Sequence, residues 1–279
     1  MKIENEILTS RQNPKVCYAA SLAEKKGREK AHAFLAEGEK LTLDALSAGL
    51  PVTQIYAMAS RRERLTERIF PAASGENYRD LQWFWLSDEA FSKISTEKAP
   101  QGVVSVIKYL DFFRKMDIIY KEDFFLSPGE RAIALHEVRD PSNLGAVIRS
   151  AAAFGIDTVI LSSDCADIYS PKTVRAAMGS LFRVKIVSVG DFSSFVRSAR
   201  AVGRRVLSAE LSESAVPLDR AGLSGDDIVV IGNEGHGVPR GISELCDAGL
   251  YIPITERAES LNASVAASVI LWEQRKGTK

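Results

Sequence analysis

The chain has 279 residues, 46% of them hydrophobic and 26% charged, which indicates a globular protein that can bury a core without disulfides or metals. No apolar run approaches the roughly 20 residues of a membrane helix, and the charged first residues lack the apolar segment of a secretory signal. The formal net charge is zero, so binding of a polyanion would depend on local clusters of Lys and Arg.

Cysteine and histidine form no pattern that predicts a disulfide framework or a metal site. Each occurs three times at scattered positions, namely Cys17, Cys165, Cys246, His32, His136 and His236. We interpret the cysteines as reduced thiols and expect no bound metal. The expected protein is soluble and cytoplasmic, without a membrane segment.

Residues 1–108 indicate a small α/β domain. Helical patterns cover 13–26, 39–48, 61–64 and 90–94, and apolar strand patterns cover 34–38, 52–59 and 102–107. Trp83 and Trp85 lie two residues apart, as on one face of a strand. We assign both rings to the core rather than to stacking on bases.

Residues 109–130 mix aromatic and charged side chains with a Ser-Pro-Gly turn, and we interpret them as a linker that packs on one domain. From residue 131 onward, short apolar runs alternate with helical patterns. Strands are expected at 132–135, 158–161, 183–189, 205–208, 228–231 and 250–252, and helices at 146–154, 172–178, 193–201 and 264–274. This alternation predicts a parallel α/β sheet over 131–279, whose ligands bind beyond the carboxyl ends of the strands.

Three loops at these carboxyl ends contain the candidate functional residues. The first, 140–149, leads into a helix for which Ser142 or Asn143 is the expected cap, with Arg149 nearly two turns further along the same side. The second, 231–239, has glycines in the order G-x-x-G-x-G, which differs from the dinucleotide fingerprint and from a P-loop. The third, 251–267, runs through Ser260 and Asn262 into a helix of small residues. Taken alone, each loop is also compatible with a purely structural role, as a capped helix or a glycine turn.

The residue types in these loops argue against several kinds of catalysis. The sequence shows no Ser–His–Asp set, close carboxylate pair or metal-ligand cluster. What remains is backbone amides, asparagines, one glutamate and one arginine. This inventory favours a cofactor that carries its own electrophile, because its transfer needs positioning and proton removal more than covalent catalysis.

Taken together and in this order, the three loops resemble the SpoU (TrmH-type) branch of the SPOUT methyltransferases. The first family motif is matched by Asn143, Gly145 and Arg149, and the second, G-N-E-G-x-G, by Gly232 to Gly237. The third is matched by Ile252, Pro253, Ser260, Leu261 and Asn262. The stretches 9–14, 36–38 and 100–103 resemble the ribosomal-protein-like domain that presents RNA in many of these enzymes, and 177–182 is also similar to the family.

The resemblance implies an α/β protein with a carboxy-terminal SPOUT domain, whose parallel sheet is tied in a trefoil knot, preceded by a small ribosomal-protein-like α/β substrate-binding domain. It also implies that the knot loops hold S-adenosylmethionine (SAM) and that catalytic domains pair as a homodimer. The positions that match the family's cofactor contacts are Gly232, Ile252 and Leu261. The positions that match its catalytic and substrate sites are Asn143, Arg149, Glu234, Ser260 and Asn262.

We therefore predict transfer of a methyl group from SAM to a ribose 2′-hydroxyl, a group that only RNA offers. In this hypothesis Arg149 grips an RNA phosphate and orients or activates the hydroxyl. Asn143 holds that geometry, and Glu234 positions Arg149 or the ribose. Ribosomal RNA is favoured over transfer RNA because the front domain is extended.

Several alternatives stay open at this point. Where the third motif often has a glycine, this chain has Glu256, which favours a non-catalytic RNA-binding or ribosome-assembly factor of the same fold. A transfer-RNA 2′-O-methyltransferase is a second alternative, and a nucleotide-dependent oxidoreductase is a third that the glycine order disfavours. The best candidate for a basic RNA-binding surface, or otherwise a solvated helix face, is formed by Arg11, Lys15, Lys25, Lys26, Arg28 and Lys30.

Overall fold

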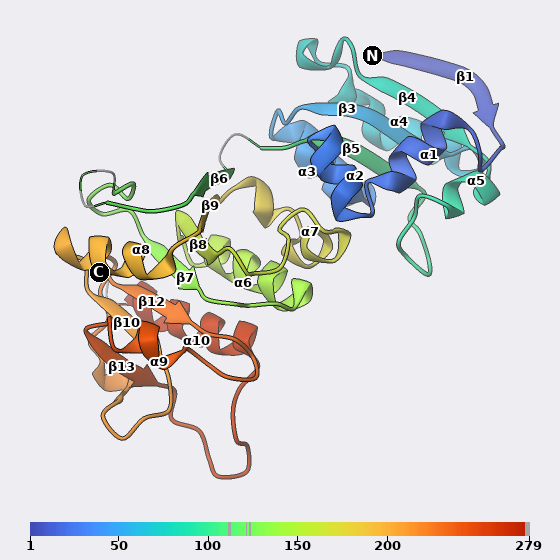
Figure 1. Cartoon of the computed structure of the whole chain (residues 1–279). Coiled ribbons are helices and arrows are strands. Elements are labelled where there is room, and N and C mark those ends of the chain that lie inside the picture. Colours follow the sequence, from blue (N-terminus) through green and yellow to red (C-terminus); the bar gives the residue numbers. More distant parts are fainter. Residues whose placement is uncertain (111–112, 121, 123, 277–279) are drawn as a thin grey trace. The chain divides into compact units, whose positions relative to one another are not determined.

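The computed structural model describes residues 1–110, 113–120, 122 and 124–276. Its contacts divide the chain into two compact units (Figure 1). Unit 1 comprises Met1–Leu110 and Asp167–Phe182, and unit 2 comprises the described residues of 111–166 and 183–279. The sequence predicted a single domain boundary, in the linker 109–130. The structure instead groups residues 167–182 with unit 1. Within that expected linker, residues 111, 112, 121 and 123 lie outside the described residues.

Unit 1 is built on a five-stranded mixed sheet of order β1-β4-β3-β5-β2, in which β5 runs antiparallel to β3 and β2. The strands are β1 Lys2–Leu8, β2 Ala33–Glu37, β3 Val52–Met58, β4 Gln82–Leu86 and β5 Val103–Lys108. The helices are α1 Pro14–Ser21, α2 Lys25–Ala31, α3 Glu39–Ser47, α4 Arg62–Ala73, α5 Asp88–Ser92 and α7 Pro171–Ala177, with 3-10 turns η1 Ala59–Arg61, η2 Glu76–Tyr78 and η4 Ser180–Phe182. The small α/β domain expected from the sequence is therefore present.

The expected single helix over 13–26 is two helices, α1 and α2. A Cβ added to Gly27 would lie 1.9 Å from the carbonyl oxygen of Ser21, so the second helix passes close to the end of the first only because residue 27 is glycine. The guanidinium of Arg28 donates to the carbonyls of Leu22 and Ala23, at 3.0 and 2.6 Å. These bonds satisfy carbonyl groups that the broken helix leaves free.

Arg28 is also the clearest correction to the predicted basic surface. Its side chain is buried, 3% of the residue being exposed, and it binds Oδ2 of Asp167 at 2.6 Å. Lys15 forms an ion pair with Glu4 and lies over the ring of Phe84. Since these two cations are already paired inside unit 1, the six residues do not form a continuous free basic surface.

Aromatic rings attach the segment 167–182 to unit 1. Tyr169 stacks between Phe34 and Tyr109, with ring centroids 4.6 and 4.3 Å apart, and its hydroxyl accepts from the amide of Leu110 at 2.9 Å. Helix α7 packs against β2. These contacts join residues more than fifty positions apart, so local periodicity gave no sign of them.

The assignment of Trp83 and Trp85 to the core is confirmed. Both side chains on β4 are almost completely buried. The ring of Phe70 on α4 packs edge-on against Trp83, with centroids 4.6 Å apart. Because both indoles are covered by their own unit, neither is available for stacking on a base.

Unit 2 is built on an eight-stranded sheet whose strand pairs, among the described residues, are all parallel, as the sequence predicted. Its order is β11-β13-β10-β12-β7-β8-β9-β6. The strands are β6 Phe113–Met116, β7 Ala132–Leu135, β8 Thr158–Ser162, β9 Lys185–Val189, β10 Val206–Ala209, β11 Val216–Pro217, β12 Ile228–Ile231 and β13 Ala248–Tyr251. All residues of β7, β8 and β12 are buried, which explains their continuous apolar sequences.

The helices of unit 2 are α6 Pro141–Ala153, α8 Phe192–Ala201, α9 Arg240–Ser243 and α10 Ala263–Lys276, with the 3-10 turn η5 Leu218–Arg220. Helix α10 packs on α6 (Figure 1), where the hydroxyls of Ser150 and Ser268 lie 2.7 Å apart. Within the described part of the chain, no helix has the length and apolar character needed to cross a bilayer.

A buried carboxylate stabilises the start of this sheet, and its removal gives a testable prediction. Burial opposes the ionisation of Glu130, but hydrogen bonds from Thr158, Ser127 and Lys185, at 2.6, 3.1 and 3.0 Å, outweigh it and lower its pKa. We expect Glu130→Gln to lower the free energy of unfolding by about 1–3 kcal/mol at pH 7.

The sign of the pH dependence follows from the lowered pKa. The charge of Glu130 stabilises the fold above the unfolded-state pKa, roughly 4.3, and this contribution is lost as pH falls through the lower folded-state value. Urea unfolding at pH 7 and in steps down to pH 3.5 should therefore show the two proteins converging in acid. If Glu130→Gln lowered the free energy of unfolding equally at every pH, the effect would come from packing and not from the charge of Glu130.

Candidate active site

The three candidate loops follow strands of the parallel sheet in unit 2. The first follows β7, the second follows β12, and the third follows β13 and ends at α10. Strands β7 and β12 are neighbours, and β10 separates β12 from β13. Because the strands are parallel, their carboxyl ends lie at the same edge of the sheet, where ligands of such sheets bind.

Asp140 caps helix α6, which corrects the expectation that Ser142 or Asn143 would do so. Its Oδ1 accepts from the backbone amides of Ser142 and Asn143, at 2.8 and 2.9 Å. Pro141 occupies the first helical turn, where its missing N–H costs nothing. The side chain of Asn143 is consequently free to bond outside its own helix.

Side chains from all three loops join in one hydrogen-bonded chain. Asn143 donates from Nδ2 to Oε1 of Glu234 at 2.9 Å, and its Oδ1 accepts from Nδ2 of Asn262 at 3.0 Å. Oδ1 of Asn262 accepts from the amide and hydroxyl of Ser264, at 2.9 and 2.6 Å, and so caps α10 as expected. The direction of each bond is fixed, because the carboxylate of Glu234 only accepts. Three of the eight predicted site residues therefore lie together.

The glycine-rich loop is a tight turn that its own backbone closes. Asn233 and Gly237 exchange both backbone hydrogen bonds, at 3.0 and 2.9 Å. A Cβ on Gly232 would lie 2.1 Å from the carbonyl carbon of Gly237, and Gly237 itself has a φ of +67°. Both positions therefore require glycine for the turn itself, and this holds Glu234 at the exposed tip.

Asn233 is a site residue that the sequence analysis did not single out. Its Nδ2 donates to the carbonyl of Glu137 at 2.9 Å, which ties the loop after β12 to the loop after β7. Its Oδ1 accepts from the amide of Gly235 at 2.8 Å. The signal was available, since Asn233 is the asparagine of the G-N-E-G-x-G motif.

The other predicted site residues are not joined to this hydrogen-bonded chain. Arg149, on α6, and Ser260 are exposed, and the side chain of neither makes a hydrogen bond or ion pair with any described residue. Ile252 and Leu261 are partly exposed and offer apolar surface at the two ends of the third loop. Gly232 is buried beneath the glycine turn. Their roles stay predictions.

Two titratable side chains follow β7 and β8 but remain uncharged at neutral pH. Burial lowers the pKa of His136 and raises the pKa of the Cys165 thiol, which donates to the carbonyl of Leu135 at 3.4 Å. A protonated buried thiol is a poor nucleophile. Among the described residues, no group of three or more His, Cys, Asp or Glu side chains is arranged to hold a metal ion.

Comparison with known families gives two matches. The sequence model of the SpoU rRNA Methylase family matches residues 130–272, and that of the MRM3-like substrate binding domain matches residues 13–105. The first match contains all three loops, and the second falls within unit 1.

Individual relatives are similar over nearly the whole chain. The 23S rRNA (guanosine(2553)-2′-O)-methyltransferase RlmP of Bacillus subtilis (strain 168) is 31% identical over 268 residues, 96% of this chain and 98% of that protein. The 23S rRNA (guanosine-2′-O-)-methyltransferase RlmB of Acinetobacter baylyi is 33% identical over 80% of this chain and 88% of its own. The crystal structure of an AdoMet-bound rRNA methyltransferase from Sinorhizobium meliloti aligns with a TM-score of 0.79 and 30% identity, covering 98% of both chains.

Proposed function

This chain belongs to the SpoU rRNA methylase family, and on that premise we propose that it transfers a methyl group from SAM to a ribose 2′-hydroxyl of ribosomal RNA. The observation that carries the proposal is the hydrogen-bonded chain from Asn262 through Asn143 to Glu234. It unites all three motif loops at the carboxyl edge of the sheet. Ribosomal RNA is favoured over transfer RNA because the similar proteins RlmP and RlmB are named for 23S rRNA.

The residues at this edge fit SAM. The partly exposed side chains of Ile252 and Leu261 offer apolar contacts, and the turn above Gly232 brings backbone amides and carbonyls close to a ligand. Glu234 adds a carboxylate, which suits a positively charged cofactor. When bound, SAM supplies a methyl group on a sulfonium, so the protein has to position the acceptor rather than form a covalent intermediate.

Arg149 is the residue that we assign to the acceptor RNA. The fork of donors on its guanidinium matches a phosphate, so it grips the phosphate beside the target ribose and orients the 2′-hydroxyl. Asn143 holds the opening turn of the same helix against Glu234. Glu234 has a second oxygen to orient the ribose or Arg149, and Ser260 and Asn262 complete the substrate side of the third loop.

A direct assay tests this function. The full-length protein is incubated with radiolabelled SAM and 23S rRNA from a strain that lacks the gene, and the 2′-O-methyl positions are then mapped. We expect one labelled ribose that is also methylated in the wild-type strain. Tight rRNA binding without any methyl transfer would support the non-catalytic alternative and overturn the proposal. Glu256, on which that alternative rested, is exposed.

The proposal includes a homodimer formed through unit 2. Helix α10 exposes Val265, Val269 and Trp272, whose exposed fractions are 47%, 37% and 47%. The spacing i, i+4, i+7 puts them on one helix face, and an apolar stripe of this kind favours an interface with a second copy. The proposal also includes a trefoil knot within 131–279, domain boundaries after residue 108 and before residue 131, and a cytoplasmic location.

Trp272→Asp tests the dimer. Burying an unpaired carboxylate in an apolar interface is costly, so we expect the variant to elute as a monomer at micromolar concentrations at which the wild type is a dimer. Light scattering coupled to size exclusion measures the mass. Val202→Asp is the control, since Val202 is 40% exposed at the end of α8. A Trp272→Asp protein with the wild-type mass would contradict the interface.

A further inference from the structure

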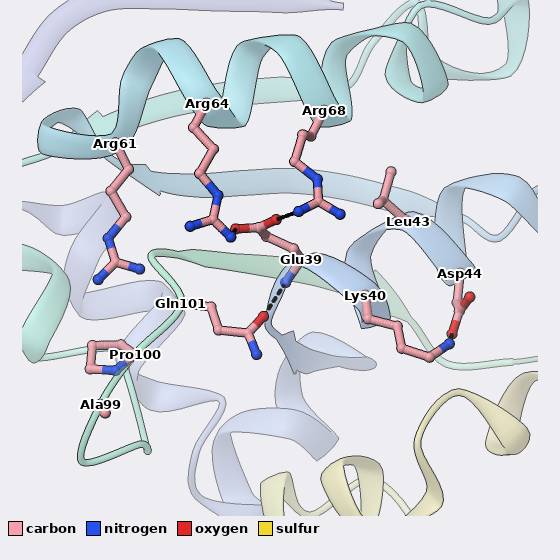
Figure 2. Close-up of a pocket in the computed structure, with 10 residues that line it drawn as sticks. All are labelled: Glu39, Lys40, Leu43, Asp44, Arg61, Arg64, Arg68, Ala99, Pro100 and Gln101. Carbon is pink, nitrogen blue, oxygen red and sulfur yellow. Dashed lines mark hydrogen bonds and ion pairs between the residues drawn. The ribbon is translucent and has the colours of Figure 1, made fainter.

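A basic cavity in unit 1, separate from the candidate active site, has no role in the function proposed so far. It has a volume of about 670 Å³ and lies between α3, η1, α4 and the turn before β5. Figure 2 shows Arg64 and Arg68 extending from α4 to Glu39, and Arg61 extending from η1 on the side of Pro100 and Gln101. Their spacing of three and four residues places the three guanidinium groups on one helix face.

Glu39 holds two of these guanidinium groups in place. Its side chain is 5% exposed and pairs through Oε1 with Arg64 at 2.7 Å and through Oε2 with Arg68 at 3.1 Å. The arginine side chains are themselves 58% and 53% exposed. A guanidinium has five N–H donors, so most donors of both arginines remain free for a ligand, and the buried carboxylate reduces their freedom to move.

Gln101 and the start of α3 add further donors to the same wall. Oε1 of Gln101 accepts from the amide of Glu39 at 3.0 Å, which leaves its NH₂ group as a donor (Figure 2). The helix begins after Gly38, which has no side chain to cap it. The positive end of the α3 dipole therefore also lies at this wall.

The charges of the cavity do not balance. Four cations, Arg61, Arg64, Arg68 and Lys40, line it with two anions, Glu39 and Asp44, which gives a net charge of +2. Lys40 pairs with Asp44 at 2.7 Å and Glu39 with two arginines. Arg61 has no carboxylate partner among the described residues, although its stem is held against Gly102, where an added Cβ would lie 2.8 Å from Cδ of Arg61.

We propose that this cavity binds one unpaired nucleotide of the substrate RNA, with the two phosphodiesters that flank it. Two phosphodiester charges match the net charge, and arginine forks bind phosphate oxygens in pairs. The volume lies in the range of ligand pockets, roughly 300–1,000 Å³. A concave site accepts a splayed nucleotide of a loop or bulge, which is the usual target of RNA recognition, whereas the phosphates of a duplex lie on a convex surface. The inference rests on the proposed function and adds a contact outside the methyl-transfer site.

Arg61→Gln tests the cavity most directly, because it removes a cation without a carboxylate partner among the described residues and leaves the ion pairs of Glu39 with Arg64 and Arg68 intact. We measure equilibrium binding of the full-length protein to 23S rRNA from the gene-deleted strain between 50 and 300 mM KCl. For single-stranded nucleic acid, one phosphate contact contributes a factor of about [salt]⁻⁰·⁷, or roughly fivefold at 0.1 M. The Kd should rise by about that factor, and the slope of log Kd against log salt should fall by about 0.7.

Two further variants complete the design. Lys40→Gln removes an exposed cation of the same cavity with little risk to folding, and should also weaken binding and reduce the salt slope. Arg79→Gln is the matched control, because the Arg79 side chain is 76% exposed on unit 1 and does not line the cavity. Thermal unfolding shows whether each variant is folded.

The outcomes separate this inference from the proposed function. If the wild type methylates rRNA and Arg61→Gln raises KM for rRNA with little change in kcat, the cavity binds RNA as proposed. If the wild type methylates rRNA and both cavity variants bind it like Arg79→Gln, the inference is wrong and the function stands. If the cavity variants lose affinity for AMP but not for rRNA, the cavity takes a free nucleotide and the inference is again wrong. Absence of methyl transfer by the wild type contradicts the proposed function instead.

Discussion

Replacing Arg149 with alanine is expected to lower kcat for methyl transfer by a factor on the order of 10² or more, because the phosphate contact that positions the 2′-hydroxyl for transfer is lost. Arg149 is exposed on α6 and has no carboxylate partner among the described residues, so its removal leaves no buried charge unpaired. The Kd for SAM should stay within about twofold, since the residues that we assign to the cofactor lie on the second and third loops. Single-turnover kinetics with 23S rRNA and calorimetry with SAM measure the two effects separately.

Two companion variants make this result specific. Arg197→Ala removes another exposed helical arginine of unit 2, on α8, and should retain wild-type kinetics. Arg149→Lys keeps the charge but loses the planar fork, and we expect it to recover less than about a tenth of the lost rate. Normal turnover by Arg149→Ala would refute the assigned role, and loss of SAM binding would show a structural one.

The parallel sheet of unit 2 was predictable because its central strands are buried on both faces. Strands β7, β8 and β12 have continuous apolar sequences that can be recognised without any structure. The strands β1, β6 and β11 were missed. Each lies at a sheet edge and has at most one buried residue, so neither apolar runs nor a clean alternation distinguishes them from loops.

At the candidate site, the spacing of the motifs identified the residues but not their contacts. The bond between Asn143 and Glu234 joins residues 91 positions apart, and the bond between Asn143 and Asn262 joins residues 119 positions apart. Both bonds depend on the course of three loops. The cap of α6 was assigned wrongly although a local signal existed. Proline is favoured at the first helical position, so Pro141 points to Asp140 as the cap.

The basic surface on α1 and α2 was predicted from charge alone, and charge alone does not show pairing. Arg28 is buried against Asp167, a partner 139 residues away that no local pattern could indicate. The row Arg61, Arg64 and Arg68 carries a helical period in the sequence itself. What could not be foreseen is that Glu39, from α3, fixes two of these side chains around a cavity.

Gly232→Ala is expected to lower methyl transfer by roughly 100-fold or more while the sheet stays folded. The new Cβ would lie 2.1 Å from the carbonyl carbon of Gly237 and 2.2 Å from the nitrogen of Val238, and backbone atoms cannot yield as a flexible side chain can. The turn from Asn233 to Gly237 must therefore open and carry Glu234 away from Asn143. A displacement of about 1 Å in a catalytic arrangement is enough for a loss of 10²-fold.

The matched control for Gly232→Ala lies in the same turn. At Gly235 an added Cβ would meet Oδ1 of Asn233 at 3.4 Å, an ordinary contact, so Gly235→Ala should lose less than about fivefold. Thermal unfolding reports on the sheet, calorimetry on SAM affinity and single-turnover assays on transfer. If the two alanine variants behave alike in all three measurements, the turn is not held by the close approach at Gly232. The chain from Asn262 through Asn143 to Glu234 would then depend on something other than the shape of this loop.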